Sequence, residues 1–286
     1  MGALNNAIMV RPFLKWAGGK RQLLHVIKAL LPPQIENYNY VEPFIGAGAL
    51  LFELKPQKAI INDSNSQLIT TYKAIKNDID ELIELLNIHQ NNNCKEYYYE
   101  IRSQDRNSSV FNKLSDVEKA ARLIFMNKTC YNGLYRVNSK GLFNVPYGKY
   151  KNPKICEENV LRSVHRYFSL NCVEIMNADF SCITKSISSN SFVYFDPPYH
   201  SPSNTNFTGY QADGFSEKDQ LRLRDDYIQL AERGVKCLLS NADTPFIREI
   251  YANKKFEIFT ISAKRCINSD ASLRGDVNEV IIKNWV

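Results

Sequence analysis

The 286-residue chain alternates short apolar runs with longer segments in which apolar residues recur every third or fourth position. Short runs that are rich in β-branched and aromatic side chains and are bounded by turn-forming residues predict buried strands. The strands predicted in this way cover residues 39–42, 58–62, 173–176, 191–195, 235–240, 256–261 and 277–283.

Helical periodicity separates most of these runs. The predicted helices cover residues 21–31, 49–54, 65–76, 79–89, 95–105, 116–129 and 216–233. Ser216 suits the N-cap of the last of these helices, and Gly234 suits its C′ position. Residues 131–147 carry Asn-Gly and Asn-Ser-Lys-Gly turn signals, which predict a β-hairpin or an ordered loop.

Strand–helix alternation of this kind predicts an α/β protein with a doubly wound sheet. The alternation is interrupted once, between about residues 75 and 165, by several helices and the hairpin or loop. We therefore predict a main domain formed by residues 1–74 and 166–286, with residues 75–165 as an inserted subdomain.

The strand at 191–195 leads directly into Asp196-Pro197-Pro198-Tyr199. Ligands of open α/β sheets bind at the carboxyl ends of strands, so this acid and this ring are expected in a binding site. Two prolines fix φ and lack N–H groups, which predicts a stiff turn with free carbonyl groups. A flat, amino-bearing substrate suits this turn, because the acid and a carbonyl accept from the amino group while the ring stacks. A purely structural turn is the alternative.

A glycine turn lies at residues 42–48 (Glu-Pro-Phe-Ile-Gly-Ala-Gly), between a predicted strand and a predicted helix. Gly46 and Gly48 permit a tight turn and a close approach of the backbone to a ligand. The dinucleotide fingerprint needs a third small residue where this chain has Leu51. Asp63 ends the next strand, where nucleotide-binding folds place an acid on ribose hydroxyls, so the pattern favours an adenosine-type ligand.

Residues 15–20 (Lys-Trp-Ala-Gly-Gly-Lys) are not a Walker A loop. That motif needs a glycine where this chain has Leu14, and a Ser or Thr where it has Arg21. The segment predicts either a glycine turn beside a buried Trp16, or a cationic aromatic loop that closes over a small-molecule site.

The net charge of +6 is modest, but its distribution is uneven. Residues 119–154 contain eight Lys or Arg residues and no Asp or Glu. Aromatic residues are interleaved with them, namely Tyr131, Tyr135, Phe143, Tyr147 and Tyr150. This mixture suits a polyanion that carries stackable bases. A solvated basic face is the alternative.

Cysteine and histidine usage argues against disulfides and metal sites. The seven cysteines are scattered without a Cys-x-x-Cys motif, and none of the four histidines pairs with an acid at metal-ligand spacing. No apolar run approaches the ~20 residues that span a membrane, and residues 1–10 show no secretory signal. We therefore expect reduced thiols, no membrane partner and a cytoplasmic location.

Seven motifs together are similar to those of the Dam-type DNA adenine-N6 methyltransferases, and the similarity covers nearly the whole chain. The motifs are Lys-Trp-Ala-Gly-Gly-Lys (15–20), Glu-Pro-Phe-Ile-Gly-Ala-Gly (42–48), Asn-Asp (62–63), Tyr-Asn-Gly-Leu-Tyr-Arg-Val-Asn (131–138), Phe-Asn-Val-Pro-Tyr-Gly (143–148), Asp-Pro-Pro-Tyr (196–199) and Ser-Asn (240–241). Within that family the chain resembles most the bacterial Gram-positive GATC methylases that partner restriction enzymes.

The resemblance implies a methyltransferase sheet with S-adenosylmethionine across the carboxyl ends of its strands. The positions that match the family's cofactor contacts are Trp16, Lys20, Phe44, Gly46, Gly48, Asp63, Asp179, Phe180 and Asp196. Asp63 would bind the ribose, Phe44 would wall the pocket, and Asp179 and Phe180 would lie near the cofactor's adenine.

The resemblance also implies that the turn at 196–199 holds the target adenine. Asp196 and the Pro197 carbonyl would accept from both N–H bonds of the amino group, and Tyr199 would stack on the base. Transfer would then be direct, by positioning and electrostatics, without a covalent intermediate. A base inside double-stranded DNA cannot reach such a pocket, so the enzyme would have to flip the base out of the duplex.

The inserted helical and hairpin subdomain would be the DNA reader. By family correspondence, Arg136 would read a guanine edge in the major groove. The other positions that match DNA contacts are Lys15 for the first base, Tyr131, Asn132 and Leu134 for the gap left by the flipped base, Pro146 for a thymine methyl, and Tyr150 for the backbone. The match over residues 131–148 points to GATC.

Two alternatives remain open at this point. The first is a methyltransferase that acts on another amino group. Enzymes that methylate protein glutamine or several RNA amino groups use Asn-Pro-Pro-Tyr, and Ser-Pro-Pro-Tyr is typical of enzymes that methylate cytosine N4. Asp196 in this chain favours adenine in DNA. A silent methyltransferase fold that only binds nucleic acid is the other alternative, and the acids at 63, 179 and 196 argue against it. A cognate restriction endonuclease would share the site without forming a stable complex.

Overall fold

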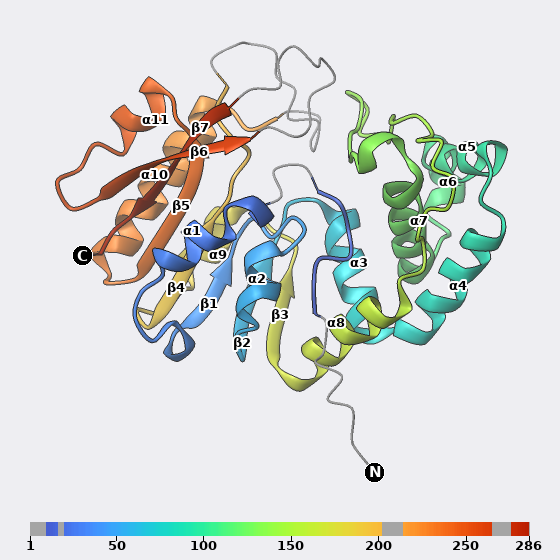
Figure 1. Ribbon diagram of the computed structural model, residues 1–286, viewed down its shortest axis with the longest axis horizontal. Coiled ribbons are helices and arrows are strands. Elements are labelled where there is room, and N and C mark those ends of the chain that lie inside the picture. The colour runs from blue at the N-terminus through green and yellow to red at the C-terminus, as the bar shows by residue number, and fades with distance from the viewer. Residues whose placement is uncertain (1–9, 17–19, 202–213, 265–275, 286) are drawn as a thin grey trace.

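The centre of the molecule is a seven-stranded sheet in the order β3-β2-β1-β4-β5-β7-β6 (Figure 1). This computed structural model describes residues 10–16, 20–201, 214–264 and 276–285. The strands are β1 (Asn39–Glu42), β2 (Lys58–Asn62), β3 (Cys172–Met176), β4 (Ser191–Phe195), β5 (Lys236–Ala242), β6 (Glu257–Lys264) and β7 (Asp276–Lys283). Neighbours among β1 to β5 pair in parallel, whereas β7 lies antiparallel between β5 and β6.

The strand order reverses between β1 and β4. From β1 the chain moves outward to β2 and β3, and β4 then returns to the other side of β1. In a doubly wound sheet this reversal leaves a crevice outside the carboxyl ends of the two strands. The glycine turn at 42–48 and the turn at 196–199 both begin at this point. The predicted fold class is confirmed.

The helices cover the sheet and extend beyond one end of it. They are α1 (Leu24–Ala29), α2 (Ala49–Leu54), α3 (Ser66–Asn77), α4 (Ile79–Asn91), α5 (Lys95–Ser103), α6 (Ser108–Phe111), α7 (Asp116–Thr129), α8 (Glu158–Leu170), α9 (Phe180–Lys185), α10 (Glu217–Glu232) and α11 (Pro245–Ile250). Short 3₁₀ turns are η1 (Lys20–Gln22), η2 (Ile35–Asn37), η3 (Gln104–Arg106) and η4 (Tyr131–Gly133).

Two hydrophobic cores lie on the two faces of the sheet. Successive strand residues point to opposite faces, so Tyr40 and Phe192 belong to one core, and Val41 and Val193 to the other. The first core joins α1, α2, α3 and α8, and it continues without a break into α4, α5 and α7. The second core joins α9, α10 and α11. In Figure 1, α4 to α7 stand beside the sheet as a separate group of helices that this shared core anchors.

Most of the predicted elements are confirmed. β1, β2, β4, α2 and α7 have the predicted bounds, and the other predicted elements are shifted by a few residues. The Ser216 side chain caps α10 by accepting from the backbone N of Asp219, and Gly234 has a φ of 81°. Residues 131–147 form an ordered loop, because their pairing is limited to the isolated bridges Cys130↔Tyr147 and Val137↔Phe143.

Four helices, α6, α8, α9 and α11, were not predicted. Three of them have only four to six residues, a length at which the helical period is weak, and they begin at the side-chain caps Asn107, Asp179 and Thr244. α8 is different, because its 13 residues bury Val160, Leu161, Val164, Tyr167 and Phe168 on one face. The spacing of these five residues is itself a helical signal in the sequence.

Candidate active site

A buried asparagine joins the loops that leave β1, β2 and β3. Asn62, the last residue of β2, is 1% exposed. Its Nδ2 donates to the carbonyls of Pro43 and Ala178, both at 3.0 Å, and its Oδ1 accepts from the backbone N of Ala178 at 2.9 Å. A buried amide whose donors and acceptor are both used fixes its neighbours firmly. Three loops at the carboxyl edge are therefore held in one arrangement.

The glycine turn folds onto Asp63. Gly46 and Gly48 have φ values of 48° and 69°, in the left-handed region that glycine adopts easily. Oδ2 of Asp63 accepts from the backbone N of Gly46 at 3.1 Å, and its Oδ1 accepts from the backbone N of Asn65 at 2.9 Å. Burial raises the pKa of Asp63 to about 6, although these two N–H groups oppose the shift.

Trp16 covers this turn. A Cβ atom added to Gly46 would lie 3.1 Å from Cδ1 of Trp16, so only a glycine leaves the indole this close to the backbone. The indole also stacks on Tyr135, with ring centroids 5.1 Å apart and an interplanar angle of 24°. Trp16 thus lies between the glycine turn and the loop at 131–147. Residues 17–19 of the predicted glycine segment lie outside the described residues.

Three phenylalanines form an aromatic wall next to the turn. The ring centroid of Phe44 lies 5.3 Å from that of Phe180 and 5.8 Å from that of Phe215, and the last two are 5.9 Å apart. Arg222 lies 4.9 Å from the Phe180 ring. Phe44 and Phe180 were predicted, whereas Phe215 was not. Such a wall offers flat surfaces on which a nucleobase can stack.

Asp179 has two structural partners. Its Oδ1 accepts from the backbone N of Ser181 at 3.0 Å, which caps α9, and it lies 2.7 Å from Nη2 of Arg222. The side chain is exposed. A capping role therefore accounts for this acid without any ligand.

A lysine occupies the turn at 196–199. Nζ of Lys20 lies 3.0 Å from Oδ1 of Asp196 and 4.3 Å from the centroid of the Tyr199 ring. Lys20 is buried, with 5% of its surface exposed. Burial raises the pKa of Asp196 to about 6, Lys20 opposes this shift, and Glu279 adds to it. The ammonium group therefore lies over the face of the ring on which a substrate base would stack.

The ring of Tyr199 is held from β7. Its hydroxyl donates to Oε2 of Glu279 at 2.7 Å. Glu279 was not predicted, because 80 residues separate it from Tyr199 and the pairing of β7 with β5 brings them together. A hydrogen bond to a charged acceptor sets the position of the hydroxyl end, and with it the plane of the ring.

Two buried amides support the back of the same turn. Nε2 of Gln220 donates to the Pro198 carbonyl at 2.9 Å, and Nδ2 of Asn241 donates to Oε1 of Gln220 at 3.0 Å. Oδ1 of Asn241 accepts from the backbone N of His200 at 3.0 Å. The expectation that both proline carbonyls are free is wrong for Pro198, whose carbonyl Gln220 binds. Gln220 carries no sequence signal, since α10 brings it to the turn only in the folded chain.

A comparison with known families decides what kind of enzyme this site belongs to. The family model described as D12 class N6 adenine-specific DNA methyltransferase matches residues 16–267, which include the glycine turn, Asp63 and the turn at 196–199. The chain belongs to this family. The resemblance predicted from the motifs is confirmed, and so is the prediction that the chain is an adenine-specific DNA methyltransferase.

Relatives from three organisms share nearly the full length of this methyltransferase. It is 50% identical to the Type II methyltransferase M1.LlaDCHI of Lactococcus lactis subsp. cremoris, covering 98% of this chain and 97% of the relative. It is 44% identical to the Type II methyltransferase M.MjaIII of Methanocaldococcus jannaschii, covering 96% and 99%. It is 35% identical to the DNA adenine methylase of Escherichia coli strain K12, covering 95% and 94%.

The positions predicted to contact DNA gather around one loop of the methyltransferase. The backbone N of Tyr131 donates to the Pro146 carbonyl at 2.8 Å, so these two exposed residues are neighbours. Nε of Arg136 donates to Oδ1 of Asn144 at 2.7 Å. Asn132 is exposed with a φ of 55°, and Leu134 is half-buried.

Lys15 and Tyr150 meet at the other end of this loop. Nζ of Lys15 lies 4.9 Å from the centroid of the Tyr150 ring. The side chain of Asn127 binds both backbone polar groups of Lys15. Oδ1 of Asn127 accepts from the backbone N of Lys15 at 2.9 Å, and Nδ2 of Asn127 donates to the Lys15 carbonyl at 2.7 Å. The segment before Trp16 is therefore attached to α7.

Part of the basic stretch at 119–154 is not available to a polyanion. Arg122 is 1% exposed and pairs with Asp105 at 3.1 Å, and Nζ of Lys128 lies 2.6 Å from Oε2 of Glu157. The prediction that the whole stretch suits a polyanion is wrong for these two residues, because they balance acids that precede or follow the stretch. The exposed cations are Lys140, Lys149, Lys151 and Lys154.

No group of three or more His, Cys, Asp or Glu side chains in residues 10–16, 20–201, 214–264 and 276–285 could hold a metal ion. In the described part of the chain, no helix has the length and hydropathy to cross a membrane. The cysteines at 94, 130, 156, 172, 182 and 237 are free thiols, and Cys266 lies outside the described residues.

Proposed function

We propose that the enzyme transfers the methyl group of S-adenosylmethionine to N6 of an adenine flipped out of double-stranded DNA, and that its target is GATC. The observation that carries this proposal is the arrangement of Asp63 and Asp196. Asp63 and Asp196 directly follow β2 and β4, which both pair with β1, so the ends of these two strands lie about two strand spacings, roughly 10 Å, apart. A nucleoside cofactor and a target base can therefore meet across β1.

The residues around the glycine turn fit S-adenosylmethionine. When bound, this cofactor supplies a methyl group on a positively charged sulfur. Asp63 offers a buried carboxylate to the ribose hydroxyls, and the Gly46 backbone permits a close approach. Phe44 and Phe180 would flank the cofactor's adenine. Trp16 would cover the turn, and Gly48 would keep it tight.

The turn at 196–199 would prepare the adenine amino group. Its lone pair is delocalised into the ring, so the free base is a poor nucleophile. Asp196 and the Pro197 carbonyl would accept from the two N–H bonds and aim the lone pair at the methyl group. Tyr199, held by Glu279, would stack on the base. The nitrogen would lose one proton after it gains the methyl group.

Lys20 has to move when the base enters. Its ammonium group lies 4.3 Å from the Tyr199 ring centroid, which is the space that a stacked adenine would take. Its ion pair with Asp196 keeps that carboxylate charged while the pocket is without a base. We infer that the ammonium shifts toward the cofactor side and leaves Asp196 to the amino group.

We also propose that residues 75–165 form the DNA-recognition subdomain and residues 1–74 and 166–286 the catalytic domain. Tyr131, Asn132 and Leu134 would fill the gap left by the flipped base. Two of the relatives are named Type II methyltransferases. We therefore propose that this enzyme protects sites that a restriction endonuclease also recognises, without a stable complex between the two.

Transfer of a labelled methyl group tests the reaction. The purified enzyme with labelled S-adenosylmethionine should label a GATC duplex, and should leave matched RNA and protein substrates unlabelled. Incorporation into RNA or protein instead of DNA would point to a different amino group. Binding of DNA without any transfer or S-adenosylmethionine affinity would identify a silent methyltransferase fold.

Activity should fall at low pH. Asp196 must be ionised to accept from the amino group, and its pKa is raised to about 6. The reactive form is therefore complete above that pH and is lost as the pH falls through it. In a pH series, kcat/KM, which reports groups of the free enzyme, should drop about tenfold per unit below the pKa. The variant Asp196→Asn has no such group, so a wild-type-like pH dependence of its residual kcat/KM would assign the titration elsewhere.

Arg136 should determine selectivity at one base pair. An Arg that reads a guanine edge contributes about 1–3 kcal/mol of discrimination. The measured quantity is the ratio of kcat/KM on GATC to kcat/KM on duplexes with one G·C pair changed. In Arg136→Ala this ratio should fall roughly 5- to 150-fold, which corresponds to that free energy. An unchanged ratio would exclude Arg136 as the reader.

A further inference from the structure

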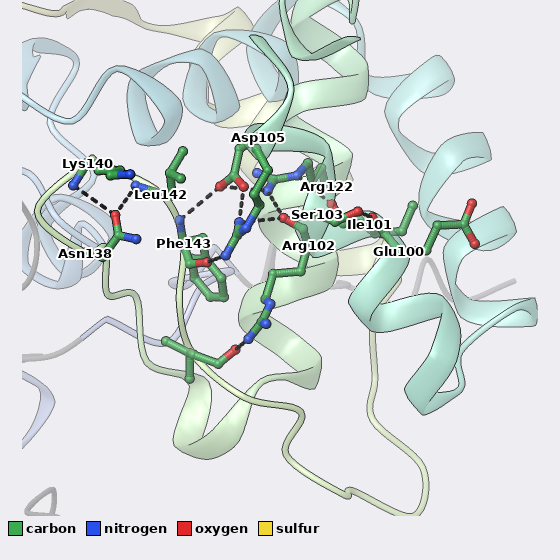
Figure 2. Close-up of polar contacts among 12 residues, drawn as sticks. Glu100, Ile101, Arg102, Ser103, Asp105, Arg122, Asn138, Lys140, Leu142 and Phe143 are labelled. Carbon is green, nitrogen blue, oxygen red and sulfur yellow. Dashed lines mark hydrogen bonds and ion pairs between the residues drawn. The ribbon is translucent and has the colours of Figure 1, made fainter.

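A buried ion pair lies next to the segment that carries the predicted DNA contacts. Arg122 on α7 is 1% exposed, and its Nη2 lies 3.1 Å from Oδ2 of Asp105 on η3 (Figure 2). Nε and Nη2 of Arg122 donate to the carbonyls of Ile101 and Arg102, both at 3.0 Å. A buried charge persists only when it is paired and hydrogen-bonded, so these contacts fix the place of Asp105 closely.

Asp105 and its neighbour Arg106 bind both backbone polar groups of Phe143. Oδ2 of Asp105 accepts from the backbone N of Phe143 at 2.9 Å, and Arg106 donates to the Phe143 carbonyl. Arg106 also pairs with the Asp105 carboxylate. The Phe143 ring is buried, with its centroid 5.7 Å from that of Tyr135. Residue 143 is thus fixed through its backbone and its side chain.

Phe143 in turn places the residue that orients Arg136. Asn144 comes next, its Oδ1 accepts from Nε of Arg136 at 2.7 Å, and its backbone N donates to the Arg136 carbonyl at 3.0 Å. The following carbonyl, of Val145, accepts from Tyr98 at 2.8 Å and from Arg102 at 3.1 Å. Asn144 therefore lies between two residues that side chains from α5 and η3 hold.

A guanidinium group is planar, so a bond at Nε sets the plane in which its two Nη groups can meet a base edge. Bidentate contact with guanine needs that plane to match the plane of the base. The contacts from Arg122 through Asp105, Phe143 and Asn144 to Arg136 therefore control the group that would read the sequence.

We propose that Asp105 and Arg106 are positioning residues for base recognition: they hold Phe143, Phe143 places Asn144, and Asn144 aims Arg136. This inference rests on the proposed function, in which the segment at 131–150 reads the target. It also accounts for the lack of acids in residues 119–154. The carboxylate that organises the segment comes from residue 105, so no acid within the segment opposes the DNA phosphates.

Two variants and a control test the proposal. In Asp105→Asn, the amide keeps one acceptor oxygen, but an NH₂ group replaces the other oxygen. The carboxylate accepts from Arg122 and from the backbone N of Phe143, and the NH₂ group cannot accept from either of them. Arg106→Ala removes the bond to the Phe143 carbonyl, and since the Arg106 side chain is 34% exposed, folding tolerates this change better. Arg162→Ala is the matched control, because it removes an arginine from an ion pair with Asp80 and Glu158 on α4 and α8.

The measured quantity is kcat/KM on a GATC duplex divided by kcat/KM on duplexes with one base pair changed. The amount of folded enzyme cancels from this ratio, so a loss of stability alone leaves it unchanged. We expect this ratio to fall about tenfold in Asp105→Asn and in Arg106→Ala. A tenfold fall is near the lower end of the loss of discrimination expected when one base contact is removed. Arg162→Ala should keep the wild-type ratio.

Each outcome bears on one of the two proposals. A wild-type ratio in Arg106→Ala overturns the positioning role, even if Asp105→Asn fails to fold. If Arg136→Ala lowers the ratio while Arg106→Ala does not, the proposed reader stands and the positioning role is wrong. If the wild-type enzyme transfers no methyl group to any duplex, the proposed function itself fails.

Discussion

Replacing Asp196 with alanine should abolish methyl transfer, with a loss of about 10³-fold or more in kcat. In the proposed mechanism the carboxylate is the acceptor that fixes one N–H bond of the adenine, and the Pro197 carbonyl alone cannot hold both N–H bonds. The variant also leaves the buried Lys20 ammonium without the partner that lies 3.0 Å away. Affinity for DNA should stay close to that of the wild type, because the proposed base readers lie on the loop at 131–150.

A matched control exists on the neighbouring strand. Asp243 follows β5 directly, as Asp196 follows β4, but it pairs with Arg248 at 2.6 and 3.0 Å instead of facing Tyr199. Asp243→Ala should keep the wild-type kcat. Single-turnover transfer, DNA binding and thermal unfolding measured on both variants separate catalysis from folding. Near-wild-type turnover in Asp196→Ala would remove this residue from the mechanism.

Replacing Asp63 with alanine should weaken S-adenosylmethionine binding by about 10–100-fold, since a hydrogen bond to a charged group contributes about 1.5–3 kcal/mol. The variant removes the proposed ribose acceptor. It also leaves the backbone N–H groups of Gly46 and Asn65 without their acceptor, which loosens the glycine turn. DNA affinity should change little, because Asp63 lies on the proposed cofactor side of β1.

Glu118→Ala controls for the loss of a carboxylate that binds the backbone. Oε2 of Glu118 accepts from the backbone N of Ser115 at 2.7 Å, in a capping box at the start of α7. Its S-adenosylmethionine affinity, measured by calorimetric titration, should equal that of the wild type. If Asp63→Ala also binds the cofactor with wild-type affinity, Asp63 plays no part in holding the ribose.

Local patterns were sufficient to predict the elements that position the site. The strand at 191–195 and the helix at 116–129 were predicted with their bounds, because a dense apolar run and a capped amphipathic period are each decided by neighbouring residues. The edge of the sheet at which the motifs meet also follows from the alternation of strands and helices. These features locate the crevice before any contact is known.

Contacts between distant segments were not predictable in this way. Glu279 reaches Tyr199 because β7 pairs with β5, and Gln220 reaches Pro198 because α10 packs beside that turn. Arg122 belongs to the stretch that the composition predicts to bind a polyanion, yet it is buried against Asp105. The sequence shows that residue 122 is charged, but it does not show which residue pairs with it. Because Arg122 pairs with the buried Asp105, its charge lies in the interior instead of facing solvent.

A map of methylated bases shows whether this enzyme methylates N6 of adenine in GATC. The chain and its Asp196→Ala variant would be expressed in a host that lacks DNA methylation, and the host DNA would be sequenced by a method that reads modified bases. We expect N6-methyladenine on both strands of GATC sites with the wild-type chain, and none with the variant. Methylated cytosine, methylation of another sequence, or unmodified DNA with the wild-type chain would contradict the proposed function.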